Sequence, residues 1–236
     1  MSNKTAQTLQ KVKGVSLRLL IALAVFGAIL LLLLYITDEI VLENESGFDN
    51  RVFQFLRGYT SPAVTATMIF FTFFGSMKFL FPAYCILVLY FLFYKKNKLR
   101  SFNIAAIGIS SIAILFLIKD IFKRHRPSDP LIANVKGFSF PSGHSTSAFT
   151  FFGLLIYIIW ESQVSRWLKW VASIALFFFA VLIAASRVYL HVHYASDVVA
   201  GFCLAVLWLT ICIFVLHRIE NEKRLKKNDN ELESGI

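Results

Sequence analysis

The stretch SRVYLHVHYASDVV, residues 186–199, joins two long apolar segments at 170–185 and 196–216. It places an arginine, two histidines and an aspartate beside segments whose composition suits a lipid bilayer. Ionisable side chains are costly inside hydrocarbon, so such a group is expected at the membrane surface and needs a functional reason. The stretch therefore predicts two membrane helices whose connection carries chemistry.

The composition of the whole chain extends this prediction. Of its 236 residues 57% are hydrophobic and only 16% charged, whereas soluble domains carry about a quarter charged residues. A helix rises ~1.5 Å per residue and must cross ~30 Å of hydrocarbon. We therefore expect an all-α, polytopic membrane bundle with six transmembrane helices, at 15–37, 77–94, 101–122, 144–160, 170–185 and 196–216.

The region between the first two spans is expected to hold short helices. Phe48, Val52, Phe55 and Leu56 recur at helical spacing and predict an interfacial helix. Residues 62–74 are apolar but short, and Gly75-Ser76 follows them. They indicate a partial or re-entrant helix that leads into the second span. A full crossing there would give seven spans and reverse the later loops.

The basic residues indicate the orientation. With six spans, both termini share one side, which collects fifteen of the 24 basic residues. These are Lys4, Lys11, Lys13, Arg18, Lys95, Lys96, Lys98, Arg100, Arg166, Lys169, Arg218, Lys223, Arg224, Lys226 and Lys227. The first loop of the opposite side is acidic, with Asp38, Glu39, Glu43, Glu45 and Asp49. The positive-inside rule then places the termini in the cytoplasm and the histidine loops outside.

This arrangement divides the chain and excludes some functions. We expect a cytoplasmic N-terminal segment at 1–14, a membrane domain at 15–217 and a charged cytoplasmic tail at 218–236, frayed helix or disordered. The net charge of +10 lies beside apolar blocks, as topology signals do, so nucleic-acid binding is not expected. Cys85, Cys203 and Cys212 lie inside apolar segments and suggest neither a disulfide nor a zinc site.

A first polar cluster, KDIFKRHRP, ends the third span at residues 119–127. Lys119 and Arg126 are two helical turns apart and could point the same way before Pro127 stops the helix. For Lys123 and Arg124 we expect the usual fate of basic residues at a helix end, with their charges reaching toward water. Asp120 would pair with Arg124 at i,i+4.

A second cluster, PSGHSTS at 141–147, begins the fourth span. A turn entering a helix exposes free backbone N–H groups at the positive end of the helix dipole, which binds anions. Ser142 adds a hydroxyl, Gly143 allows close approach of the backbone, and His144 could donate a proton. A capping serine beside a loop histidine would be the structural alternative.

The opening stretch is the third cluster. His193 and Asp197 are four residues apart, so on a helix the carboxylate could fix the imidazole tautomer and leave one nitrogen free as a nucleophile. Arg187 could grip an oxyanion with two hydrogen bonds. His191 and His125 have no partner at such spacing, and a structural or interfacial role is expected for both.

Together the clusters offer three cations, a backbone anion site, two histidines and an orienting aspartate. This set suits phosphoryl transfer through a phosphohistidine. Two-metal chemistry needs clustered carboxylates, whereas Asp120, Asp129 and Asp197 are scattered, so neither metal nor other cofactor is expected.

At these residues the sequence resembles the type 2 phosphatidic acid phosphatase superfamily, whose patterns are KxxxxxxRP, PSGH and SRxxxxxHxxxD. They match 119–127, 141–144 and 186–197, across the last four spans. The resemblance implies that His193 attacks phosphorus, Asp197 orients it, and His144 protonates the leaving oxygen and then activates water. It also implies that Lys119, Arg126, Ser142, Gly143 and Arg187 hold the phosphoryl oxygens, without a divalent metal.

The function that follows is a lipid phosphate phosphatase at the outer face of a plasma or inner membrane. Its partners would be membrane lipids and a phosphorylated lipid, with polyprenyl pyrophosphate, phosphatidylglycerol phosphate, phosphatidic acid and a lipid A phosphate as candidates. Two alternatives stay open: a phosphotransferase that passes the phosphoryl group to an alcohol, and a non-catalytic transporter or lipid-binding protein. Product analysis with an acceptor, and phosphate release in EDTA, would separate them.

Overall fold

The structure, a computed structural model, describes residues 3–42, 46–133 and 135–233. In these ranges all regular structure is helical. The elements are α1 (Asn3–Tyr35), the π-helix η1 (Ile36–Leu42), α2 (Gly47–Arg57), α3 (Pro62–Phe73), α4 (Met77–Leu89), the π-helix η2 (Tyr90–Tyr94), α5 (Lys98–Phe122), α6 (Gly143–Glu161), α7 (Arg166–Tyr189) and α8 (Ala195–Glu233).

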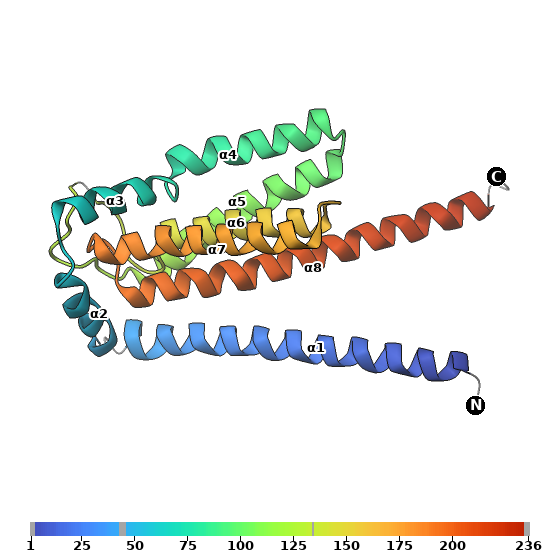
Figure 1. The fold of residues 1–236 in the computed structure, drawn as a ribbon, viewed down its shortest axis with the longest axis horizontal. Coiled ribbons are helices and arrows are strands. Elements are labelled where there is room, and N and C mark those ends of the chain that lie inside the picture. Colours follow the sequence, from blue (N-terminus) through green and yellow to red (C-terminus); the bar gives the residue numbers. More distant parts are fainter. Residues whose placement is uncertain (1–2, 43–45, 134, 234–236) are drawn as a thin grey trace.

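The long helices run back and forth along one axis and form a bundle (Figure 1). Among the described residues, six helical segments are long and apolar enough to cross a membrane: Leu19–Asp38, Pro62–Tyr94, Lys98–Phe122, Gly143–Glu161, Arg166–Tyr189 and Ala195–Ile219. The predicted class, a six-span helical membrane protein, is confirmed.

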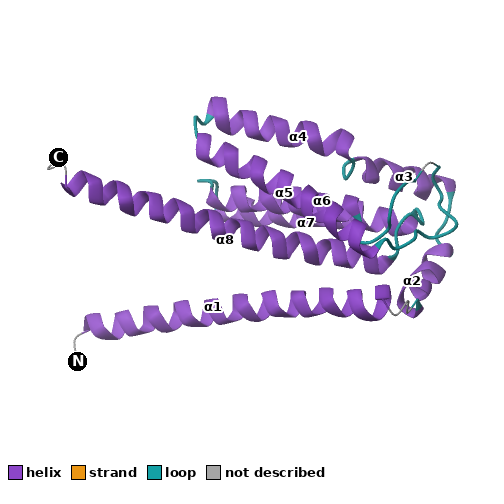
Figure 2. Ribbon diagram, turned by 180° about the vertical axis from the view of Figure 1, so that it is seen from behind, coloured by secondary structure: helices purple, strands orange, loops and turns teal. Residues whose placement is uncertain are grey.

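The two ends of the bundle differ. The start of α1 and the end of α8 lie at the same end, whereas α2, α3 and the long loop between α5 and α6 gather at the other (Figures 1 and 2). An even number of crossings returns a chain to the side on which it began. All three polar clusters of the sequence belong to the end with the long loop.

Helix α2 lies at that end of the bundle and buries one carboxylate while part of its apolar stripe stays exposed. Phe48 and Phe55 of the predicted apolar stripe are 42% and 65% exposed, while Asp49 is completely buried. Val52 and Leu56 of the same stripe are half-buried, so Phe48 and Phe55 are the apolar side chains that this helix could present to lipid. The buried face of α2 therefore carries a carboxylate into the protein.

Helices α3 and α4 form one broken crossing. The chain turns at Phe74–Ser76 and continues in the direction of α4 without returning to the end where α3 began (Figure 1). A Cβ on Gly75 would lie 2.5 Å from Ile183 Cγ2 of α7 and 3.2 Å from His144 of α6. Only a residue without a side chain allows the break to approach this closely.

The central core joins α6, α7 and α8 around small residues. Ala148, Ala180, Ala184 and Ala205 are buried there among phenylalanines of α6. Small side chains let helix backbones approach and pack in a membrane, where burial of apolar surface alone does not drive association. This rigid core supports the ends of α6, α7 and α8, from which most of the site is built.

Some residues named in the sequence analysis lie outside the part of the chain that the structure describes. Glu43 and Glu45 lie outside the described residues, as do the side chains of Lys4, Lys11, Lys13, Arg18, Glu39, Lys223, Arg224, Lys226 and Lys227. The backbone of the expected tail is helical, as the continuation of α8 through Glu233. Of the three cysteines, Cys203 is buried, whereas Cys85 is exposed and does not belong to the core.

Candidate active site

Helix α5 ends at the predicted end of the third span and does not continue to Pro127. Its last residue is Phe122, and Lys123 adopts a left-handed conformation with φ 47°, its N–H bonded to the Lys119 carbonyl. The helix therefore stops five residues before Pro127, so the proline does not terminate it. Arg126 consequently lies in a loop, and its proximity to Lys119 is a product of that loop and not of helical spacing.

The loop brings the first cluster back over the end of α5. Lys119 Nζ donates to the Phe138 carbonyl at 2.7 Å and to the Ser139 carbonyl at 3.4 Å. Arg126 donates to the carbonyls of Gly137 and Val192 at 2.9 and 2.7 Å. Backbone carbonyls thus fix both cations, which a long flexible side chain at a membrane surface would not otherwise achieve.

The PSGH turn enters α6 as predicted. Ser142 is the N-cap and its Oγ accepts from the Ser145 N–H at 3.4 Å and from the Ser145 hydroxyl at 2.9 Å. Its own N–H donates to the Asp197 carbonyl at 3.0 Å, which ties α6 to α8. A Cβ on Gly143 would meet only Leu115 Cδ2 at 3.5 Å and Lys119 Cε at 3.9 Å, so the first residue of α6 faces the lysine across open contacts.

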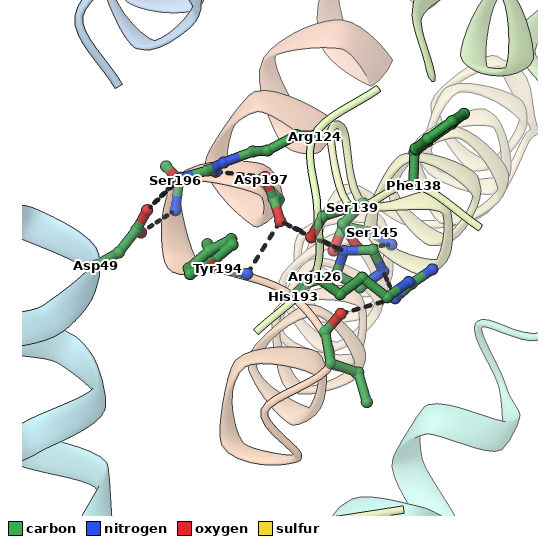
Figure 3. A network of polar contacts seen from close by, with 12 residues as sticks. Asp49, Arg124, Arg126, Phe138, Ser139, Ser145, His193, Tyr194, Ser196 and Asp197 are labelled. Atoms are coloured by element: carbon green, nitrogen blue, oxygen red, sulfur yellow. Dashed lines mark hydrogen bonds and ion pairs between the residues drawn. The ribbon is translucent and has the colours of Figure 1, made fainter. Parts of the chain in front are cut away.

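His193 lies in the turn between α7 and α8, and not on a helix with Asp197 as the four-residue spacing implied. The two side chains still meet, with Nδ1 3.5 Å from Asp197 Oδ2. Ser139 lies between them: its Oγ is 3.3 Å from Nδ1 and donates a short hydrogen bond to the same carboxylate oxygen (Figure 3). The sequence reasoning did not identify Ser139.

The hydrogen bonds decide the tautomer of His193. Arg126 Nη1 lies 3.1 Å from Nε2, and a guanidinium can only donate, so Nε2 carries the lone pair and Nδ1 the proton. Burial lowers the pKa of His193 to about 4, with a further decrease from Arg126 and Arg187, while Asp197 opposes the change. The imidazole is therefore neutral near pH 7, as a nitrogen nucleophile must be.

Arg187 projects from the last turn of α7 and is only 4% exposed. Its Nη1 donates to Thr72 Oγ1 of α3 at 2.6 Å. Its buried Nε has no hydrogen-bond acceptor among the described residues. A buried cationic donor without an acceptor is costly, so this atom indicates an anionic ligand. Thr72 is a further contact that the sequence reasoning did not identify.

His144 completes the group from the first turn of α6. Its ring packs against the break at Gly75, and Arg187, His193 and Lys119 all act on it electrostatically. The three clusters, separated by up to 78 residues of chain between Lys119 and Asp197, thus meet at one end of the bundle.

Arg124 contradicts its expected role. Asp120 pairs with Lys123, at 3.7 Å on the surface, and not with Arg124. The Arg124 side chain is only 11% exposed and forms ion pairs with Asp197 at 2.6 Å and Asp49 at 3.0 Å (Figure 3). The helix that would have aligned Asp120 with Arg124 has already ended.

The remaining histidines of this end lie elsewhere. His191 packs on Phe53 of α2, with ring centroids 4.8 Å apart, and His125 is exposed. Neither makes a hydrogen bond or ion pair to the residues that surround His193 in the described part of the chain. Their placement agrees with the interfacial or structural role that we expected for them.

Known proteins are similar to this chain in sequence. The model of the PAP2 superfamily matches residues 99–220. Phosphatidylglycerophosphatase B of Bacillus subtilis is 32% identical over 148 residues, which cover 62% of this chain and 72% of the relative.

Two solved structures share the fold. One is a transmembrane PAP2 type phosphatidylglycerolphosphate phosphatase from Bacillus subtilis, with a TM-score of 0.73, 24% identity and coverage of 84% of this chain and 96% of that one. The other is LpxE of Aquifex aeolicus, with a TM-score of 0.55, 23% identity and coverage of 69% and 93%. With the family model spanning its three motifs, this chain belongs to the PAP2 superfamily, as a membrane-spanning enzyme.

Proposed function

We propose that this protein dephosphorylates a lipid phosphate or pyrophosphate at the extracytoplasmic face of a cell membrane, through a phosphohistidine at His193 and without a metal ion. One observation carries the proposal: the unprotonated Nε2 of His193 lies 3.1 Å from the Arg126 guanidinium, while its Nδ1 faces Ser139 and Asp197. A nucleophile, its orienting group and an oxyanion-binding cation are thus in contact.

In the proposed reaction, Nε2 of His193 attacks phosphorus and forms the N–P bond as the P–O bond to the lipid breaks. The leaving oxygen takes a proton from His144, which then removes a proton from the water that hydrolyses the phosphohistidine. Lys119, Arg126 and Arg187 with the N–H groups of the PSGH turn would balance the charge on the phosphoryl oxygens, which suits the loose transition state of phosphoryl transfer.

A lipid substrate is supported by an apolar groove of about 330 Å³ between α4 and α5. Its lining includes Met77, next to the Gly75-Ser76 break, and Ser147 of α6, one helical turn beyond His144. The groove continues away from the site to Val88 and Leu89 of α4. A phosphorylated lipid with its headgroup at the histidines could place a hydrocarbon tail there.

The outer face is supported by charge. The basic residues of the connections from α4 to α5 and from α6 to α7 lie at the end of the bundle that holds the termini. The site lies at the opposite end, so the positive-inside rule directs it away from the cytoplasm. Phosphatidylglycerol phosphate is the first substrate to test because the similar curated protein and the more similar solved structure, both from Bacillus subtilis, are named for it.

The test measures phosphate release by the purified full-length protein from a panel of lipid phosphates, with and without EDTA. We expect the wild type to be active in EDTA and to be inhibited by vanadate. We expect no activity in His193→Ala. Loss of a general acid lowers the rate about 10²–10⁴-fold, so His144→Ala should retain a low activity. His191→Ala is the matched control and should be mild. Normal turnover by His193→Ala would refute the assignment.

A further inference from the structure

The buried carboxylate of α2 adjoins the proposed nucleophile through two intermediates. Asp49 pairs with Arg124, Arg124 pairs with Asp197, and Asp197 contacts His193 (Figure 3). Asp49 and Asp197 are completely buried. This chain of charges crosses from an interfacial helix to the catalytic histidine, and its first member plays no part in the reaction described above.

Asp49 makes more contacts than helix attachment requires. Its Oδ1 accepts the backbone N–H of Ser196 at 2.9 Å, and its Oδ2 accepts the Ser196 hydroxyl at 2.6 Å. Ser196 lies in the first turn of α8, so the carboxylate also meets the positive end of that helix. Arg124 Nη1 donates to the same hydroxyl at 2.8 Å. Every partner of Asp49 therefore also borders Asp197.

Arg124 presents an electrostatic problem that Asp49 solves. A guanidinium 2.6 Å from Asp197 holds this carboxylate in place, but it also cancels the negative charge that His193 experiences. With Asp49 on the other side of Arg124, two carboxylates and one guanidinium leave one net negative charge. Inside a protein such charges act strongly because they are weakly screened.

That charge matters when the phosphohistidine forms. Nε2 gives its electron pair to phosphorus while Nδ1 keeps its proton, so the neutral ring becomes cationic. A negative charge beside Nδ1 stabilises the cationic ring more than the neutral one, and an interaction that strengthens along the reaction raises kcat.

We propose that Asp49 is a positioning residue that offsets the charge of Arg124, so that Asp197 can stabilise the phosphorylated form of His193. This inference rests on the proposed function. It gives the acidic first loop a role, and it makes α2 part of the catalytic apparatus as well as a membrane contact.

The test compares Asp49→Asn, the double variant Asp49→Asn/Arg124→Gln and the control Asp120→Asn. Asp120 is an exposed carboxylate whose surface pair is Lys123, so its loss should leave activity unchanged. Asp49→Asn leaves Arg124 to neutralise Asp197, and we expect kcat to fall about tenfold or more. KM should stay within about threefold of the wild-type value, because Asp49 does not contact the bound substrate.

The double variant separates charge from structure. It removes one charge of each sign and leaves amides that can hydrogen-bond, so Asp197 regains its net negative charge and kcat should rise above that of Asp49→Asn. A merely structural role predicts a double variant that is no better than the single one. That result in folded protein, or an unchanged kcat in Asp49→Asn, would overturn the proposal.

Two further outcomes are decided in advance. If Asp49→Asn does not fold, the double variant decides alone: a kcat within about tenfold of the wild type supports the proposed role of Asp49, and a larger loss rejects it. If Asp49→Asn releases phosphate as fast as the wild type and Asp120→Asn do, the proposed role of Asp49 is wrong and the proposed phosphatase function is unaffected. An inactive wild type rejects the proposed function and this inference with it.

Discussion

At the scale of single residues, the protonation of His193 reflects its surroundings more than its spacing to Asp197. The ring is 1% exposed, and Arg126 and Arg187 are close enough to disfavour its charged form. A surface histidine would have an ordinary pKa near 6.5 and would be partly protonated at mildly acidic pH. Burial therefore keeps the proposed nucleophile ready over a wider pH range.

This predicts how the protein responds to acid. Because the pKa of His193 is about 4 in the folded protein and 6.5 in an unfolded chain, the unfolded chain binds the extra proton between these values. Stability should therefore fall as the pH drops from about 6.5 toward 4. The imidazole itself should remain neutral down to about pH 4.

The measurement is the ¹⁵N resonance of His193 during a pH titration, assigned by its absence in His193→Ala. The charged groups that face this ring are Arg126, Arg187 and Asp197. His144 also interacts electrostatically with it when protonated. A midpoint for His193 near 6.5 in folded protein would contradict the burial argument.

At the scale of elements, two glycines at helix junctions serve opposite purposes. Gly75 interrupts the crossing of α3 and α4 because a Cβ there would lie 2.5 Å from Ile183 Cγ2. Ile183 is completely buried and β-branched, so it cannot rotate away. Gly143, in contrast, borders the proposed phosphate site and has room for a Cβ, which would meet Leu115 Cδ2 at 3.5 Å.

We therefore expect Gly75→Ala to lower stability by about 1–3 kcal/mol, as overpacking does. Removing the opposing side chain beyond Cβ in Gly75→Ala/Ile183→Ala should relieve that contact. Gly143→Ala should unfold at the wild-type temperature but bind substrate more weakly, because its methyl group would lie between Leu115 and the Lys119 side chain, at the proposed phosphate site. Thermal unfolding in detergent and KM values distinguish these effects. Equal losses of stability in both single alanine variants would contradict this account.

At the scale of the whole molecule, the bundle separates a polar end from an end with the termini, and six crossings link them. The orientation of this bundle in a cell determines which leaflet supplies the substrate. Positive charge predicts that the site faces away from the cytoplasm.

Single cysteines test the orientation. In a variant with Cys85, Cys203 and Cys212 replaced by alanine, Ser128→Cys lies in the exposed loop after α5, and Lys95→Cys lies at the opposite end. We expect a membrane-impermeant maleimide to label the first in intact cells and the second only after lysis. The reverse pattern would place the site in the cytoplasm.

The sequence by itself determined the class of this protein and predicted much of its candidate site. Blocks of apolar residues gave six spans, because hydrophobic length is a local property that the bilayer reads directly. Three motifs with fixed spacing carried the family, which the comparisons confirm. Local spacing also named Lys119, Arg126, Ser142, Gly143, His144, Arg187, His193 and Asp197, whose catalytic and binding roles stay predictions.

Only the tertiary structure decided how these groups are held. In the folded chain α5 ends before Pro127, His193 lies in a turn and not on a helix, and the Arg124 side chain pairs with Asp197. The tertiary structure also recruited Asp49, Thr72 and Ser139 from segments with no motif. Periodicity and spacing report contacts along one element, whereas a buried ion pair between distant loops depends on packing. No local pattern distinguishes a carboxylate in such a pair from one in water.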